Sequence, residues 1–197
     1  PWLKGGKHDP RLMLSIRLAR LAGWQRSMVS TVLSMAGQKE MAKSAHSFGR
    51  CSSSAYWDLV KAQEDYIQTF TDQMTRQGID ILICPPAATP AMTHGASFYL
   101  TSIASATMLF NLLGFPAGVV AATQVRPEES GKRATSKDLV HKTAAEVDKN
   151  SEGLPLGVQV VGKQWQDGLV MRVMKSLEDH FKQQDDYPVW PWRELSF

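Results

Sequence analysis

The chain has 197 residues, of which 43% are apolar and 21% are charged, the composition of a globular protein with one sizeable core. Two cysteines, Cys51 and Cys84, are too few for a disulfide framework and lack CxxC spacing, so we expect a reducing, intracellular environment. No run of 18 apolar residues occurs, which excludes a recognisable bilayer-crossing segment. The chain starts at Pro1 without an initiator Met, and we expect it to be a piece of a longer polypeptide.

The formal net charge of +3 hides an asymmetry along the chain. Residues 1–50 contain nine Lys or Arg and two acidic residues, a net charge of +7, whereas residues 51–197 carry a net charge of −4. The basic first quarter of the chain bears on which partners the protein binds and does not indicate its fold. Nucleic acid is a poor candidate, because the basic segment matches no nucleic-acid-binding motif and lacks interleaved stacking aromatics.

Residues 9–36 have the pattern of two short amphipathic helices joined at Gly23. Such a basic, apolar segment is typical of an interfacial membrane anchor, where each Lys or Arg contributes about 1 kcal/mol near an anionic leaflet. The residues that would meet the membrane are Arg17, Leu18, Arg20, Leu21, Trp24 and Met28. Alternatively, both helices pack on the rest of the protein and the arginines are solvated, and periodicity alone favours this second reading.

A polar connector over residues 44–55 leads into a long amphipathic helix over residues 55–77. The serines at 52–54 have no flanking glycines and no base nearby in sequence, so we interpret them as a helix N-cap rather than as a nucleophile site. Gly78 is placed to end the helix. The stripe predicted to be buried consists of Leu59, Ala62, Tyr66, Phe70 and Met74.

Three apolar segments, at 79–84, 117–125 and 154–162, are predicted to be core strands, and the last two have the composition of strands buried on both faces. A helix rich in small residues is predicted over 97–113, ending at Gly114 before a turn set by Pro116. A final helix is predicted over residues 168–181, capped by Asp167. These elements together predict an α/β core.

The remaining segments contain no recognisable chemistry. The Pro-rich loop 85–96 includes His94, and a lone histidine of this kind is more often structural or solvated than an acid or base. Residues 126–152 are charged and read as a surface excursion with one short helix over 137–149, and the Trp-rich tail reads as irregular. No nucleophile elbow, phosphate loop or metal-ligand spacing occurs, so we expect no cofactor, no metal and no complete active site.

Three motifs resemble the carboxyl-terminal part of the amidase signature family. They are IDILICPPAATPA at 79–91, FNLLGFPAGVV at 110–120 and EGLPLGVQVVG at 152–162. Within the family the chain is most similar to the fatty-acid amide hydrolases, through the basic apolar segment 9–36 and WQDGLVMRVMKSLE at 165–178. The resemblance implies one α/β/α domain around a large, twisted, mixed sheet, here preceded by an amphipathic helical hairpin.

The resemblance also implies amide hydrolysis by a Ser–Ser–Lys triad that lies in the amino-terminal half of the family's domain. No Gly-rich Ser–Ser run occurs in this chain, so we expect no catalytic residue within it. Residues 1–197 would then be the carboxyl-terminal part of one amidase domain, with 9–48 as a membrane-binding cap and 126–152 as a surface excursion. The cap would lie on the bilayer, giving peripheral or monotopic association, which reverses the preference stated above for packing.

By position in the family, Thr101, Ala104 and Met108 would line an acyl channel and Trp165 would flank the cavity. Thr107 would be a further substrate-binding residue. The implied partners are a lipid amide, a membrane surface, the rest of the amidase chain and a second copy in a homodimer. Two alternatives stay open. One is an amidase of the same family without membrane association, acting on small or tRNA-linked amides, and the other is a non-catalytic membrane-binding module.

Overall fold

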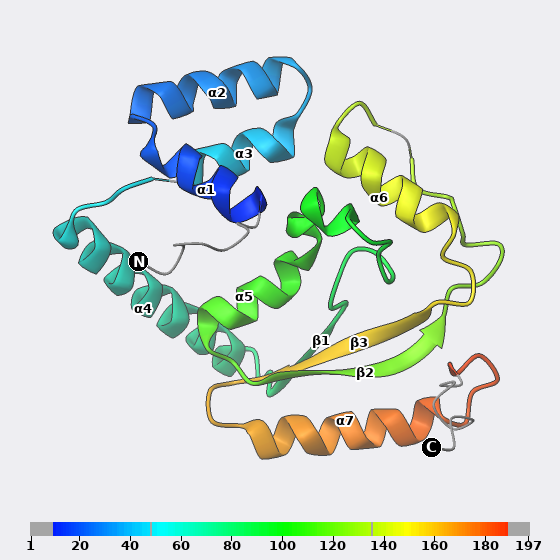
Figure 1. Cartoon of the computed structure of the whole chain (residues 1–197). Helices are drawn as coiled ribbons and strands as arrows, with labels where there is room; N and C mark the ends of the chain where they lie inside the picture. The colour runs from blue at the N-terminus through cyan, green and yellow to red at the C-terminus, as the bar shows by residue number, and fades with distance from the viewer. Residues whose placement is uncertain (1–9, 48, 135, 189–197) are drawn as a thin grey trace, which may run out of the picture.

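The computed structural model describes residues 10–47, 49–134 and 136–188, and Figure 1 shows a helical end and a sheet end. The predicted Trp-rich end of the tail, residues 189–197, lies outside the described residues. The elements in chain order are α1 Pro10–Arg20, α2 Gly23–Met35, α3 Lys39–Ser47, α4 Ser53–Arg76, β1 Ile81–Cys84, the 3-10 turns η1 Ala96–Phe98 and η2 Thr101–Ala104, α5 Ser105–Leu113, β2 Ala117–Gln124, α6 Leu139–Lys149, β3 Pro155–Gly162 and α7 Asp167–Phe181.

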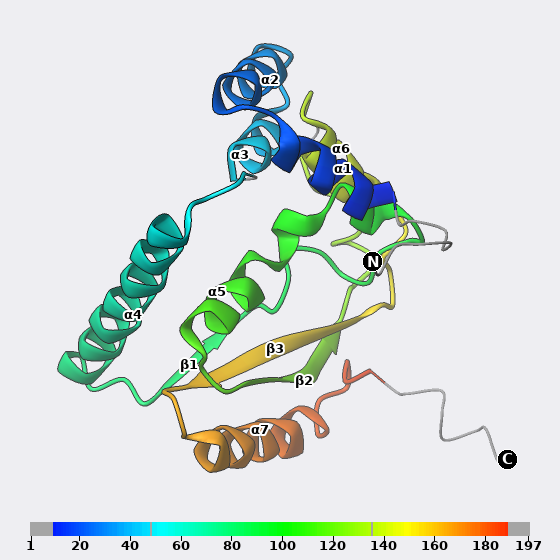
Figure 2. The ribbon, with the colours of Figure 1, turned by 60° about the vertical axis from the view of Figure 1, so that its left-hand side comes forward.

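The sheet has the strand order β1-β3-β2, and both pairings are antiparallel. The central strand β3 is the most buried, with Val160 and Val161 inaccessible to solvent. Helix α7 packs on one face of the sheet, and α4 and α5 lie on the other (Figures 1 and 2). The predicted α/β class and all three predicted strands are therefore confirmed, and the strands described here contribute an antiparallel part of the expected sheet.

The main core lies between α4, α5 and β3. Its buried residues are Met74, Phe110, Leu113, Phe115 and Val161. Phe70 and Phe115 make an edge-to-face contact with their ring centroids 5.8 Å apart. The turn between α5 and β2 orients these groups, because Gly114 ends α5 in the left-handed conformation with φ 63°, as its position in the sequence predicted.

Two predictions of burial were too broad. In α4 the predicted stripe is covered only toward its carboxyl end, where Phe70 is partly buried and Met74 is buried. Leu59, Ala62 and Tyr66 are exposed. The reason is that α5 and the sheet reach only the second half of this long helix (Figure 2). In β2, Val119 is half-exposed because the strand lies at an edge of the described sheet, so this strand is not buried on both faces.

The helix predicted over 97–113 is divided in the structure. Two 3-10 turns, η1 and η2, precede α5, which begins only at Ser105. The serines and the threonine in this stretch have intrinsic preferences for local hydrogen bonds that compete with a regular helix. At α7, Asp167 lies in the first helical turn instead of capping it, since Gln166 holds the cap position without a side-chain hydrogen bond.

An amphipathic helical hairpin precedes the sheet. The two helices predicted within residues 9–36 are found as α1 and α2, but the two that pack against each other are α2 and α3. Helix α3 was not predicted. It packs through its small residues Ala42 and Ala45, and the buried Ser30 hydroxyl of α2 donates to the Ala42 carbonyl oxygen at 3.0 Å. The term hairpin below refers to α2 and α3.

The segment 126–152 contains α6, whose inward face is buried. Val140, Ala144 and Val147 pack with Leu100 in a second core cluster, and Met41 of α3 contacts it. This apolar face was not predicted from the sequence, because the segment as a whole is rich in charged residues.

We predict that Gly157→Ala destabilises the fold. A Cβ at this position of β3 would lie 2.9 Å from the Val120 carbonyl oxygen and 2.7 Å from Val119 Cγ1, so the paired strands must separate. Overpacking of this kind costs about 1–3 kcal/mol and should lower the melting temperature measured by circular dichroism. Gly168→Ala in α7 is the control, because its Cβ meets nothing within 4 Å and should leave the melting temperature equal or higher. Equal melting temperatures for Gly157→Ala and the unaltered protein would contradict the prediction.

Candidate functional site

The outward face of α2 carries four large apolar side chains at helical spacing, Trp24, Met28, Val32 and Met35, and all are exposed. The indole of Trp24 is 68% exposed and the Met28 side chain 57%. They face solvent because α2 packs on α3 through its opposite side. A contiguous exposed apolar face of this kind marks an interaction surface.

Two arginines at the end of α1 precede this face in the chain. Arg17 and Arg20 lie in the last turn of α1 and are exposed, while Leu18 and Leu21 are partly buried. Of the six residues predicted to meet a membrane, two arginines, Trp24 and Met28 are thus accessible to a partner. The arrangement presents cationic and apolar groups together, as interfacial helices do.

A buried polar network fixes α5 over the sheet. The Thr107 hydroxyl donates to the Pro86 carbonyl oxygen at 2.7 Å and lies 3.3 Å from Oε1 of Gln159. Gln159, only 1% exposed in the centre of β3, donates through Nε2 to Sγ of Cys84 at 3.7 Å. Burial raises the pKa of the Cys84 thiol, an effect that the hydrogen bond from Gln159 opposes, so the thiol stays protonated at neutral pH.

The residues predicted to line an acyl channel lie along η2 and α5. Thr101 is exposed, Ala104 is partly buried, and Thr107 belongs to the polar network. Met108, one residue further, is 53% exposed and turns its flexible thioether to solvent. This face of α5 can therefore be contacted by a ligand or by further polypeptide.

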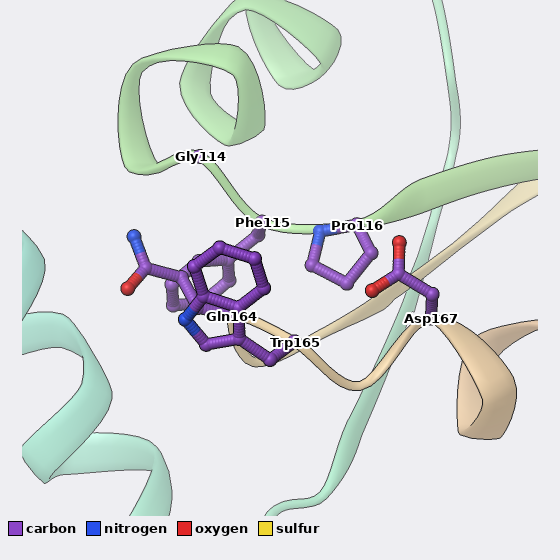
Figure 3. Close-up of a pocket in the computed structure, with 6 residues that line it drawn as sticks. All are labelled: Gly114, Phe115, Pro116, Gln164, Trp165 and Asp167. Atoms are coloured by element: carbon purple, nitrogen blue, oxygen red, sulfur yellow. The ribbon is translucent and has the colours of Figure 1, made fainter.

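A cleft of about 260 Å³ lies at the opposite end of α5 (Figure 3). Its lining residues come from two turns, one between α5 and β2 and one between β3 and α7: Gly114, Phe115, Pro116, Gln164, Trp165 and Asp167. The turns are joined where Nε2 of Gln164 donates to the Leu113 carbonyl oxygen at 3.0 Å. The cleft is smaller than the roughly 300–1,000 Å³ pockets that enclose drug-sized ligands, so it suits part of a ligand.

Trp165 stands at this cleft in an unusual conformation. Its φ of 67° is left-handed, which costs a non-glycine residue on the order of 1 kcal/mol, and its side chain is 94% exposed. Of the five residues predicted for substrate binding, Trp165 lines this cleft and the other four do not. The structure therefore brings Thr101, Ala104, Thr107 and Met108 together on one stretch and places Trp165 at a separate feature.

The serine cluster before α4 has the structural role that its sequence predicted. Oγ of Ser52 accepts from the Ala55 backbone N–H at 3.1 Å and caps α4. Within the described ranges there is no group of three or more His, Cys, Asp or Glu side chains able to hold a metal ion. No helix in the described part of the chain is both long and apolar enough to cross a bilayer.

Sequence reasoning did not identify Gln159 as a site residue, although one signal was available. Gln159 is the single polar residue in the strand LPLGVQVVG, and a buried amide must be hydrogen-bonded. Its partners, 52 and 75 residues away in sequence, could not be found from local pattern.

The sequence was compared with known proteins. Residues 22–171 match the model of the protein family Amidase. Fatty-acid amide hydrolase 1 of Sus scrofa is 30% identical over 167 residues, which cover 83% of this chain and 28% of that protein. Fatty acid amide hydrolase 1 of Caenorhabditis elegans is 31% identical, covering 63% of this chain and 22% of that protein. An amidase of Gibberella moniliformis is 30% identical, covering 60% of this chain and 19% of that protein. The chain thus spans between 19% and 28% of these relatives' length.

We predict that Thr107→Val lowers the free energy of unfolding by about 1–2 kcal/mol, because it leaves the Pro86 carbonyl and the Gln159 amide without the hydroxyl. Urea unfolding measures the change. Thr107→Ser keeps the hydroxyl and loses the methyl group that valine retains, and it should keep most of the stability. A loss of stability in the serine variant with none in the valine variant would show that the methyl group, not the network, matters.

Proposed function

Because the chain belongs to the amidase family, we propose that it is the carboxyl-terminal part of a serine amidase that hydrolyses fatty-acid amides to a fatty acid and an amine. In this proposal a serine outside residues 1–197 attacks the amide carbonyl, the amine leaves with a proton, and water then hydrolyses the acyl-enzyme. A second serine and a lysine, also outside this chain, move the protons. The present residues handle the substrate.

The observation that carries the proposal is the exposed apolar face of α2, which follows the exposed Arg17 and Arg20 in the chain. A fatty-acid amide has a very low concentration in water and is collected most efficiently from a bilayer. Trp24 and Met28 would enter the interfacial region while the arginines contact anionic headgroups, each contributing about 1 kcal/mol. The enzyme would therefore associate with the membrane peripherally or monotopically, inside the cell.

The second part of the proposal concerns the acyl chain. Thr101, Ala104 and Met108 would form one wall of its channel, with Thr107 fixing that wall to the sheet. Burial of an alkyl chain contributes about 0.8 kcal/mol per CH₂, so a mainly apolar wall is sufficient for affinity. Trp165 would flank the substrate from the separate cleft. The exposure of Met108 in this chain supports contact with substrate and with the rest of the amidase polypeptide, and a homodimer is compatible with it.

We predict that the double variant Trp24→Ser, Met28→Ser weakens binding to anionic phosphatidylserine vesicles by about tenfold or more, because two apolar side chains no longer leave water. Vesicle co-sedimentation measures this. Met171→Ser in α7 removes a methionine outside the hairpin that is more exposed than Met28, and this variant should bind normally. Normal vesicle binding by the double variant would contradict the membrane role.

We predict that Met108→Trp in the intact enzyme lowers kcat/KM for long-chain amides by roughly tenfold and leaves short-chain amides nearly unchanged, because the larger side chain narrows the channel. A series of acyl-chain lengths measures the ratio, with Met171→Trp as the matched control. A preference of the unaltered enzyme for small or tRNA-linked amides would favour the amidase without membrane association. Vesicle binding without any amide hydrolysis by the intact protein would favour the non-catalytic module.

A further inference from the structure

One carboxylate caps two helices that are far apart in sequence. Asp138 is buried, with 5% of its surface exposed. Its Oδ1 accepts a hydrogen bond from the Val140 backbone N–H at 2.9 Å and so caps α6. Its other oxygen, Oδ2, accepts from the Glu40 backbone N–H at 3.2 Å, in the first turn of α3. The first backbone N–H groups of a helix have no partner within the helix, and a carboxylate is the strongest protein acceptor for them.

The Gln38 side chain makes the reciprocal bonds. Its Oε1 accepts from the Leu139 backbone N–H at 2.8 Å, and its Nε2 donates to the Lys137 carbonyl oxygen at 3.1 Å. We call the residues Gln38, Glu40 and 137–140 the clasp. Three hydrogen bonds thus cross from the hairpin to the segment before α6, and Met41 adds an apolar contact with the cluster around α6.

The clasp determines where α2 points. Helix α3 is held at its first turn by Asp138, and α2 is fixed to α3 by the buried bond from Ser30 and by the tight turn between them, where the Gln38 N–H donates to the Leu33 carbonyl oxygen at 2.8 Å. Residues 49–52, which lead into α4 on the far side of α3, form neither helix nor strand (Figures 1 and 2).

We propose that Asp138 is a positioning residue that clasps the hairpin to α6 and thereby sets the orientation of the exposed face of α2. The proposal rests on the proposed function for the use of that face, and it assigns a task to residues 126–152. Without the clasp, the hairpin keeps its apolar face and its affinity for vesicles, but it no longer delivers substrate in line with α5.

Asp138→Asn in the intact enzyme is the sharpest test. Asparagine is an excellent N-cap and has the same size, but only one of its two terminal atoms can accept, so it can cap α6 or α3 and not both. Whichever way the amide turns, an NH₂ group faces a backbone N–H where Oδ1 or Oδ2 stood. Asp138→Ser is the second variant, since its short hydroxyl can cap α6 but cannot also reach α3. Asp179→Asn in α7 removes an exposed carboxylate elsewhere and is the matched control.

We expect the backbone amides of residues 38–42 to exchange with deuterium at least tenfold faster in both Asp138 variants, while those of β3 stay unchanged. We also expect kcat/KM for a long-chain amide presented in vesicles to fall severalfold, with vesicle binding and turnover of a short, water-soluble amide unaltered. Uniform acceleration across the fold, unchanged exchange at 38–42, or equal losses for both amides would overturn the proposal. If the unaltered enzyme does not bind vesicles, the proposed function fails, and the exchange pattern alone then decides whether the clasp holds the hairpin.

Discussion

The fold depends on the burial of β3 between two neighbouring strands and two helical layers. Its valines supply the apolar contact, but Gln159 imposes the stricter condition, because an amide with 1% exposure must find partners in the protein. It finds them in Thr107 of α5 and Cys84 of β1. A single buried polar residue thereby fixes the position of α5 over the sheet, and with it the direction in which Met108 faces.

The small extent of the buried core explains why many large apolar side chains stay exposed. The buried cluster involves the second half of α4, the end of α5 and the centre of the sheet, and it does not extend to the first half of α4 or to α2. Large apolar side chains are consequently exposed on several elements, among them Trp24 of α2, Trp57 of α4 and Val119 of β2. Faces of this kind are expected where further polypeptide or a membrane makes contact.

The features that sequence predicted well are local in origin. Gly114 was expected to end α5 and Pro116 to set the turn, and both are found there, since the relevant chemistry lies within a few residues. The stripe of α4 was only half right, because periodicity identifies a face but not how far its partner extends along it. The clasp could not be predicted at all, since Gln38 and Asp138 are 100 positions apart and each is an ordinary capping or polar residue by itself.

The exposed faces of α2 and α4 differ in charge, and this difference bears on the proposed membrane docking. Helix α4 presents Trp57 and Leu59 and contains four acidic residues against two basic ones, of which Lys61 is paired with Asp65 at 3.3 Å. Its net charge is therefore −2, and an anionic leaflet would repel it. Helix α2 contains no acidic residue, and Arg17 and Arg20 precede it in α1. Exposure alone would treat the two faces alike. Charge distinguishes them, because the electrostatic free energy near an anionic surface is favourable for one helix and unfavourable for the other. Of the two, α2 is therefore the helix suited to a bilayer.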